Sequence, residues 1–359
     1  MAQRRRALGW SQAELAARAG IPRSSLSAIE SRRLVPSVAA ALAVARALEC
    51  SVEELFGAGG LSAGGEADWA WAPPEDPCRF WEAEVGGRRW LYPVESLAAS
   101  SGKHDGIYIG GVPRGGGGTL AVRTLMVASC DPAARLLAGE YERSSGFRMI
   151  ILPRNGVAAL ELLRDGRVHV AGVHQSTKDH PFRNAERARG VLGSGFRLIR
   201  AAHWMEGIAV APSKGVRSVL QAARKAQTWA LREPGSAARE CLEEVREGRP
   251  APGRVVLSHA GVAEAVRAGW AEAGVCVKIA AQEAGVRFLP VREEAVDLCI
   301  PERYVWDPRV QALLRVLRNR EYRRTIGELP GYDARETGER VHQEGARVPS
   351  ERSLQEDPR

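Results

Sequence analysis

The residues of this chain that could do chemistry stand where apolar runs give way to helix-forming sequence. From Leu120 onward these junctions carry mostly small, hydroxylic or cationic side chains: Ser129, Cys130, Asp131, Asn155, Gly156, His174, Arg232, Gly235, Ser236, His259 and Gly261. The start of a helix presents backbone N–H groups with a partial positive charge, and glycine or serine there lets a ligand approach closely. We therefore predict that these junctions bind a small anion.

One of the junctions adds a permanent cation. The stretch LREPGSAARECLEEV, residues 231–245, places Arg232 just ahead of a Gly-Ser turn and an amphipathic helical pattern. A guanidinium offers a planar fork of donors that matches the geometry of carboxylates and phosphates. We expect Arg232, with Gly235 and Ser236, to hold the anion.

Each of these residues also has a purely structural interpretation. Gly-Ser before a helix is often only a cap, and Asp131 before Pro132 is typical of an N-cap followed by proline. His174 and His259, taken singly, are more often ordinary hydrogen-bonded histidines than ligands. It is the coincidence of several junctions that favours a binding site. The six cysteines have no Cys-x-x-Cys spacing and indicate reduced, mostly buried thiols rather than a zinc site. No metal cluster or nucleotide loop has recognisable spacing, so no metal site and no cofactor are predicted.

The junctions are separated by alternating strand and helix patterns. Strand-like runs such as LAVRTLMVAS, FRMIILP and VHVAGVH alternate with helical patterns such as PAARLLAGEYE and GVAALELLRDG, and the alternation resumes after HWMEGIAVAP. Repeated strand–helix units predict parallel sheets covered on both faces, with ligands beyond the carboxyl ends of the strands. Residues 119–335 are therefore predicted to form an α/β domain.

The first 57 residues carry a different signal. A capping box of Ser11 and Glu14 predicts a helix over about 12–19, which Gly20 ends, and a second helix follows over about 23–30. Ser37 is expected to open a third helix, and a further capping box starts at Ser51. Two short helices joined by a tight turn are what a helix-turn-helix requires.

The remaining segments are predicted from composition and turn signals. Residues 58–79, rich in Gly, Ala, Pro and acids, indicate a linker whose Trp69 and Trp71 dock on a neighbouring surface. Residues 80–118 indicate a small β unit with a type I′ hairpin at Gly86-Gly87, and the polar residues 336–359 indicate a disordered tail. The net charge of +8 favours polyanionic partners. No apolar run of about 18 residues and no signal sequence is present, which predicts a cytoplasmic protein without a membrane span.

Residues 4–57 resemble the Cro-type (XRE) helix-turn-helix family. The resemblance rests on Ser-Gln-Ala-Glu-Leu-Ala at 11–16, on a somewhat altered Ser-Leu-Ser-Ala-Ile-Glu at 25–30, and on Pro-Ser at 36–37. It implies that double-stranded DNA is the partner. It also implies that base edges or phosphates meet Arg23, Ser24 and Ser27, while Gln12 and Arg32 hold the DNA backbone.

About Leu120 to Gly338 resembles the type II periplasmic-binding-protein superfamily, in particular the cytoplasmic PBP-like domain related to molybdate-binding proteins. The resemblance is carried by CDPAARLL, NGVAALELLRDGRVHVAGVH, LREPGSAARECLEEV, SHAGVAEAVRAGWAEAGV and LPGYDARETG. It implies two lobes joined by crossover strands, which we place at 119–203 with 297–335 and at 204–296. It also implies an oxyanion ligand clamped between them, with molybdate or tungstate the leading candidates.

The chain departs from that family's pattern at the junction after Leu231. Glu233 stands where the family has glutamine, Ala237-Ala238 replace Gly-Thr, and Asn155 stands where serine is common. A fully deprotonated oxyanion brings no hydrogen of its own, so Asp131 or Glu233 facing the pocket would repel it. Such carboxylates would favour a ligand with hydroxyl or amine hydrogens.

These features predict a multidomain, non-enzymatic, one-component transcription regulator: an all-α helix-turn-helix head, a small β unit and a two-lobed α/β ligand-binding domain. A homodimer is expected, because one short recognition helix reads too few bases. The alternatives are an enzyme or molybdenum-cofactor-handling protein on a binding-protein fold, and a regulator whose C-terminal domain only dimerises. A further alternative, an extracytoplasmic transport receptor, is disfavoured because it would need a secretion signal and conflicts with the DNA-binding head.

Overall fold

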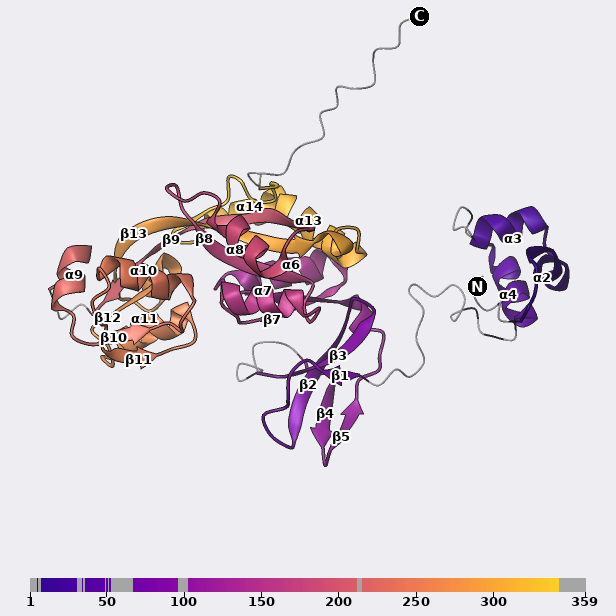
Figure 1. Ribbon diagram of the computed structural model, residues 1–359, viewed down its shortest axis with the longest axis horizontal. Helices are drawn as coiled ribbons and strands as arrows, with labels where there is room; N and C mark the ends of the chain where they lie inside the picture. The colour runs from indigo at the N-terminus through magenta and orange to yellow at the C-terminus, as the bar shows by residue number, and fades with distance from the viewer. Residues whose placement is uncertain are drawn as a thin grey trace, which may run out of the picture. The chain divides into compact units, whose positions relative to one another are not determined.

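The computed structural model describes Arg5, 8–30, Leu34, 36–48, Cys50, Val52, 67–95, 103–211 and 215–341. The chain forms two compact units, Met1–Glu66 and Ala67–Arg359. The first unit is helical, and the second combines a small β-sheet with a large α/β body (Figure 1). The predicted multidomain fold class is confirmed.

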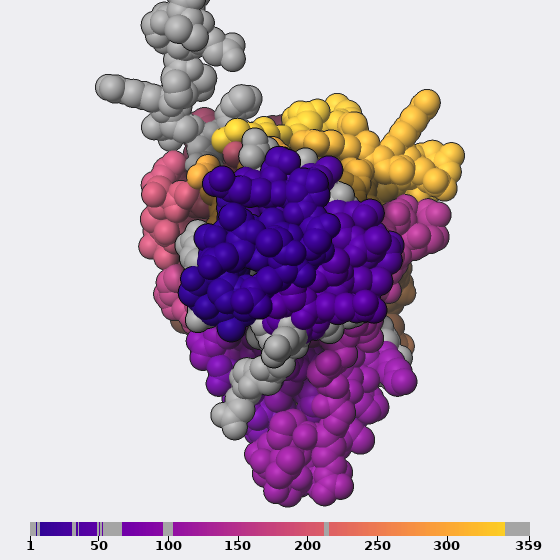
Figure 2. Space-filling model, turned by 90° about the vertical axis from the view of Figure 1, so that its right-hand side faces the viewer, coloured from indigo at the N-terminus to yellow at the C-terminus, as the bar shows by residue number. Residues whose placement is uncertain are grey.

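The N-terminal unit contains the three predicted helices, α2 (Gln12–Ala19), α3 (Arg23–Glu30) and α4 (Val38–Ala47). The capping box forms as expected, since Ser11 Oγ accepts from the Glu14 amide at 3.2 Å and Glu14 Oε2 accepts from the Ser11 amide at 2.6 Å. Gly20 ends α2 at φ 63°, and Ser37 Oγ caps α4. The three helices share a core of Leu15, Leu26, Val44 and Leu48, and their side chains form a compact body, in indigo in Figure 2. The further cap predicted at Ser51 lies outside the described residues.

The second unit begins with a five-stranded sheet in the order β1-β3-β2-β4-β5. Its strands are β1 (Asp68–Trp69), β2 (Cys78–Val85), β3 (Arg88–Pro93), β4 (Gly106–Ile109) and β5 (Val112–Gly115). The β2–β3 turn has φ 63° at Gly86 and 77° at Gly87, as the predicted type I′ hairpin requires.

The linker predicted over 58–79 is wrong for its second half, because the sheet begins at Asp68. The Trp69 ring lies edge-on to Phe80 and Tyr108, with ring centroids 5.9 and 5.1 Å apart, and Trp71 lies 5.7 Å from Tyr92. Packing of these half-buried tryptophan rings against the sheet fixes a segment whose glycine and proline content is typical of a linker. Residues 58–66 lie outside the described part of the chain.

The large body is built on a second sheet of nine strands. Eight of them run in the order β11-β10-β12-β9-β13-β8-β6-β7, and the short β14 pairs with β9. Their bounds are β6 (Thr124–Ala128), β7 (Arg148–Leu152), β8 (Val170–Ser176), β9 (Phe196–Val210), β10 (Trp229–Leu231), β11 (Gly253–Val255), β12 (Ala273–Val277), β13 (Arg287–Pro301) and β14 (Tyr332–Asp333). As predicted, β6 is parallel to β7 and β8, and β10 is parallel to β11 and β12.

Helices cover this sheet in two groups, which define two lobes (Figure 1). Lobe 1 comprises β6–β8 with α6 (Ala134–Ser145), α7 (Gly156–Arg164), α8 (Arg183–Leu192), α13 (Pro308–Arg318) and α14 (Arg320–Gly327). Lobe 2 comprises β10–β12 with α9 (Val219–Lys225), α10 (Ala237–Val245), α11 (His259–Arg267) and α12 (Lys278–Glu283). The 15-residue strands β9 and β13 pair antiparallel and run through both lobes, across the boundaries predicted near 203 and 296.

The C-terminal boundary of the packed body lies beyond the predicted one at 335. Thr337 is 1% exposed and donates to the Ala201 carbonyl at 2.8 Å, and the Val341 amide donates to the Leu198 carbonyl at 2.9 Å. The disorder predicted from 336 is therefore wrong for 336–341, because this segment adds backbone hydrogen bonds to β9. Residues 342–359 lie outside the description. Among the described helices, none has the length and apolar character needed to cross a membrane.

Candidate functional site

The helix-turn-helix presents part of the predicted DNA-binding set. Arg23 and Ser24 are exposed at the start of α3 and Ser27 is half-buried, while Leu26 and Ile29 pack inward. Gln12 has a partner within the unit, because its Nε2 donates to Glu30 Oε2 at 2.8 Å and ties the start of α2 to the end of α3. Arg32 lies outside the described residues.

In the second unit, a small cavity lies where the two lobes meet. Lobe 1 lines it with Gly156, Val157, Val173, His174, Gln175 and Arg187, and lobe 2 lines it with Gly235 and Ala237. Helix α7 begins at Gly156 and helix α10 begins at Ala237, so one helix start from each lobe meets here. The predicted convergence of Asn155-Gly156 with Gly235-Ser236 is thus present.

Asn155 and Ser236 are the N-caps of α7 and α10, which accounts for an Asn and a Ser at these two positions. Asn155 Oδ1 accepts from the Ala158 amide at 3.0 Å, and Ser236 Oγ accepts from the Arg239 amide at 3.2 Å. Each cap satisfies an amide in the first turn and leaves the helix start oriented toward the cavity. At α11 the cap is Ser258, which accepts from Gly261, so Gly261 serves the helix itself.

Polar side chains join the lobes across the cavity. Arg187 of lobe 1 lies 2.8 Å from Glu240 of lobe 2, and Gln175 Nε2 donates to the same carboxylate at 2.9 Å. Asn155 Nδ2 donates to Glu233 Oε1 at 3.1 Å. The two lobes are therefore closed on each other.

Arg232 is buried, with 2% exposure, but its fork is not directed at an open space. Its Nε lies 2.9 Å from Glu233 Oε2 and its Nη2 lies 3.0 Å from Glu233 Oε1. Burial acts most strongly and would lower the pKa of Arg232, but the bond to Glu233 and the nearby acidic groups together raise it. Arg232 as an anion ligand stays a prediction: the neighbouring carboxylate accepts from its fork, so an anion would have to displace or share that pair.

Ser129 and Asp131 belong to a different place. They line a second small cavity, inside lobe 1, together with Tyr322 and Tyr332. Asp131 Oδ1 accepts from the Ala133 amide at 2.8 Å and from the Tyr332 hydroxyl at 2.5 Å, and burial raises the pKa of this carboxyl. The side chains of Ser129 and Asp131 therefore line a different cavity from Gly156 and Gly235.

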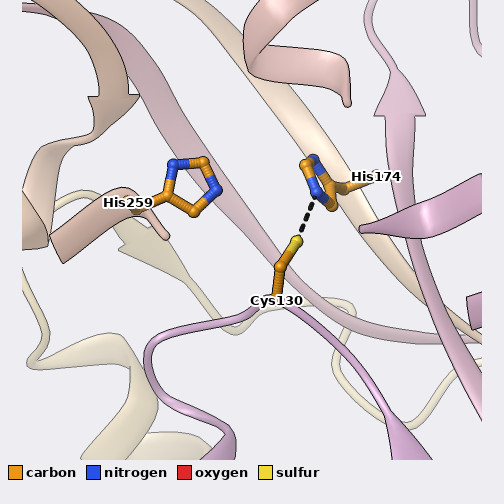
Figure 3. Close-up of side chains that lie close together, drawn as sticks. All are labelled: Cys130, His174 and His259. Carbon is orange, nitrogen blue, oxygen red and sulfur yellow. Dashed lines mark hydrogen bonds between the residues drawn. The ribbon is translucent and has the colours of Figure 1, made fainter. Parts of the chain in front are cut away.

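Cys130, His174 and His259 come together, although they are far apart in the sequence (Figure 3). Cys130 follows β6, His174 lies on β8, and His259 is the first residue of α11. One ligand atom from each, the Cys130 sulfur and a ring nitrogen from each histidine, lies within 4.8 Å of the other two. Cys130 Sγ and His174 Nε2 are 2.9 Å apart and share a proton. All three residues are predicted from the sequence as anion ligands rather than as a metal cluster, because only the fold supplies their proximity.

Side chains from β9 and β13, the strands that join the lobes, contact the Cys130–His174–His259 group. Glu294 of β13 accepts from Trp204 Nε1 at 3.1 Å and lies 3.0 Å from His174 Nδ1. Burial acts most strongly and would raise the pKa of Glu294, but the bond and charge of His174 together with the charge of Arg292 lower it, which favours an ionised carboxylate that accepts from Nδ1. Arg292 Nη2 lies 2.7 Å from Glu294 and 3.2 Å from Glu206. Burial and the charge of Glu294 raise the pKa of Glu206. Sequence analysis did not select these residues.

His259 differs from His174 in having no such support. It is 1% exposed, and within the described chain neither of its ring nitrogens has a hydrogen-bond partner. Burial and then the nearby Arg232 charge lower the pKa of His259, so its imidazole is neutral. A buried polar group left without a partner is costly and points to a group that would satisfy it.

Two family models match the chain: the PBP superfamily domain over residues 138–318 and a helix-turn-helix over residues 1–55. The chain belongs to the PBP superfamily, with a helix-turn-helix DNA-binding domain of the XRE type at its N-terminus. The uncharacterised protein YvgK of Bacillus subtilis (strain 168) is 23% identical over 224 residues, which cover 60% of this chain and 72% of that protein.

Two solved structures are also similar. A putative phosphate ABC transporter substrate-binding protein from Clostridium perfringens, with bound phosphate, is 11% identical with a TM-score of 0.46, covering 58% of this chain and 99% of that one. PhnD1 from Prochlorococcus marinus (MIT 9301), in complex with methylphosphonate, is 10% identical with a TM-score of 0.42, covering 58% and 92%. At these values neither structure bears on the ligand of this chain.

Proposed function

We propose that this member of the PBP superfamily is a transcription regulator whose binding to specific DNA sequences is controlled by a small ligand held between its two lobes. One observation carries the proposal: a helix-turn-helix domain shares the chain with a two-lobed body whose lobes meet through polar side chains around two helix starts. A ligand that binds the closed lobes more tightly than the open ones would favour the closed arrangement. Homodimerisation would place two recognition helices on paired half-sites.

For the DNA side of this proposal, Arg23 and Ser24 at the exposed start of α3 contact base edges or phosphates, and Ser27 lies one turn further on. Gln12 would contact the DNA backbone while it is bonded to Glu30. Arg23→Ala should weaken binding to a DNA sequence selected from a random pool, whereas Arg46→Ala, an exposed arginine on α4, should not. A gel shift in which both variants bind like wild type would contradict this assignment of α3.

For the ligand side, we propose a small anion at the starts of α7 and α10. Both helix starts present partial positive charge to the inter-lobe cavity, Arg187 lines it, and the buried Arg232 precedes the turn at Gly235. Molybdate and tungstate are the first candidates to test. Because Glu233 holds the Arg232 fork, a ligand with a hydroxyl or amine hydrogen would be tolerated better than a bare oxyanion.

A thermal-shift panel of molybdate, tungstate, sulfate, phosphate and small organic acids tests this proposal. We expect at least one anion to raise the melting temperature of the full chain, and Arg232→Ala to abolish the rise. Arg267→Ala, which removes an exposed arginine paired within α11, is the matched control. If no anion in the panel changes the melting temperature, the alternative that this domain only dimerises is favoured.

A second candidate function has one observation in its favour. Cys130, His174 and Glu294 lie in the order of a nucleophile, a general base and an orienting carboxylate, with contacts of 2.9 and 3.0 Å. An enzyme acting on an ester or thioester would use this arrangement. Turnover of chromogenic esters that Cys130→Ala abolishes would favour it, and the absence of turnover over the same panel would exclude such an activity.

A further inference from the structure

We propose that Cys130, His174 and His259 form a binding site for a single zinc(II) or copper(I) ion, and that this ion links the two lobes. Cys130 and His174 belong to lobe 1, and His259 opens a helix of lobe 2. Figure 3 shows the sulfur and the two imidazole rings grouped together, and their potential ligand atoms lie within 4.8 Å of one another.

The donor chemistry selects the class of metal. One thiolate and two imidazoles suit zinc(II) and copper(I), whereas magnesium and calcium prefer oxygen ligands. In a tetrahedral zinc site, bond lengths of about 2.3 Å to sulfur and 2.0 Å to nitrogen separate the donors by roughly 3.3–3.6 Å. This separation falls between the 2.9 Å of the Cys130–His174 contact and the 4.8 Å limit of the group, so modest side-chain shifts suffice. Three protein ligands leave a fourth position for water or a small ligand.

His259 supplies an independent reason to expect a ligand. Its imidazole is buried, and neither ring nitrogen finds a hydrogen-bond partner among the residues that the structure describes. The ring packs between apolar and aromatic neighbours, with its centroid 5.7 Å from Trp204 and 6.1 Å from His174. A metal ion at the cluster would satisfy one of these nitrogens.

Glu294 and Trp204 prepare His174 for the same role. Since Nδ1 is bonded to the Glu294 carboxylate, Nε2 is the ring nitrogen that faces Cys130. Trp204 Nε1 fixes the carboxylate in turn. A histidine whose second nitrogen donates to a carboxylate is the usual support of a metal-binding imidazole. Binding replaces the proton shared by Sγ and Nε2 with the metal, and this proton leaves to solvent.

A metal held by ligands from both lobes would stabilise the closed arrangement. A role of the metal ion in controlling DNA binding rests on the proposed function, whereas the metal site does not depend on that function. The experiment therefore measures metal binding in the absence of DNA first and DNA affinity second. A negative result for DNA affinity then leaves the result for the metal site unaffected.

The test is a cobalt(II) titration of the full chain after chelator treatment, followed by zinc(II) competition. We expect one cobalt ion per chain, a thiolate-to-cobalt charge-transfer band, and displacement by zinc(II) but not by magnesium. Cys130→Ser should remove the band, and His259→Gln should weaken binding at least tenfold, while His180→Gln, at an exposed loop histidine, should match wild type. Unchanged melting in chelator shows that each variant is folded.

Two results would overturn the site: no stoichiometric binding by the wild-type chain, or binding that Cys130→Ser and His259→Gln leave unchanged. The His259 variant also separates this proposal from the enzymatic alternative, because it leaves the Cys130–His174–Glu294 contacts intact. Loss of metal binding without loss of any turnover supports the metal site. If zinc(II) binds as expected but leaves DNA affinity unchanged, the site stands and the regulatory role is excluded.

Discussion

Glu240 provides the most direct test of lobe closure, because its carboxylate crosses from lobe 2 to lobe 1. It pairs with Arg187 at 2.8 Å, with side chains 26% and 36% exposed, and accepts from Gln175 at 2.9 Å. A pair at this exposure contributes about 0.5 kcal/mol, and the amide–carboxylate hydrogen bond contributes about 1 kcal/mol. Glu240→Ala should therefore destabilise the closed lobes by about 1.5 kcal/mol, slightly more than tenfold in the opening equilibrium.

Hydrogen exchange of the full chain measures this opening. In Glu240→Ala, we expect amides at the starts of α7 and α10 to exchange about tenfold faster, while amides of β6, which lies between β8 and β7, keep their protection. Glu243→Ala is the matched control, because Glu243 lies on the same helix but pairs with Arg239 of that helix at 2.8 Å. Equal exchange in all three proteins, or equal acceleration in both variants, would refute a closed state held by cross-lobe contacts.

Three further predictions concern buried charges. Asp297→Ala should cost the second unit about 3 kcal/mol in urea unfolding, because two buried donors, Arg200 Nε at 2.6 Å and Asn184 Nδ2 at 2.7 Å, lose this acceptor and only Glu336 among the described residues still pairs with Arg200; a loss below about 1 kcal/mol would contradict this. The bond from Arg5 lowers the pKa of the Glu30 carboxyl. The stability that Glu30 contributes is therefore fully present above the ordinary carboxyl pKa, and it is lost as the pH falls through the lowered pKa of Glu30. The melting temperature of the N-terminal unit within the full chain should fall in that acidic range, and Glu30→Gln should flatten the dependence; an equally steep fall in the variant would exclude this cause. Glu294→Gln should weaken zinc(II) binding by about 10- to 100-fold in the cobalt competition assay, and unchanged affinity would show that this carboxylate does not position the metal ligands.

The features that sequence analysis predicted well are local. The Ser11–Glu14 capping box and the Gly86-Gly87 turn form because both partners lie within a few residues, so the pattern contains the whole interaction. The order of strands and helices followed from periodicity for the same reason. The segment around Trp69 was mispredicted because its glycine and proline content says nothing about the aromatic pocket that holds it.

The candidate site depends on contacts that no local pattern contains. Asn155-Gly156 and Gly235-Ser236 were correctly expected to converge, because helix starts follow the ends of sheet strands. The pairing of Arg232 with Glu233 is a matter of side-chain conformation between sequence neighbours, which periodicity cannot show. The meeting of Cys130 with His259 requires two lobes to close, and therefore appears only in the folded chain.

Occupation of the space between the lobes should change the affinity of the helix-turn-helix for DNA. The measurement is fluorescence anisotropy of the full chain on a DNA duplex selected from a random pool, with and without zinc(II) and with and without each anion that stabilises the chain. We predict a change in Kd of at least about fivefold for one such ligand, the lower end of ordinary allosteric coupling. An identical Kd under all these conditions, with a ligand shown to be bound, would mean that ligand binding between the lobes does not control DNA binding.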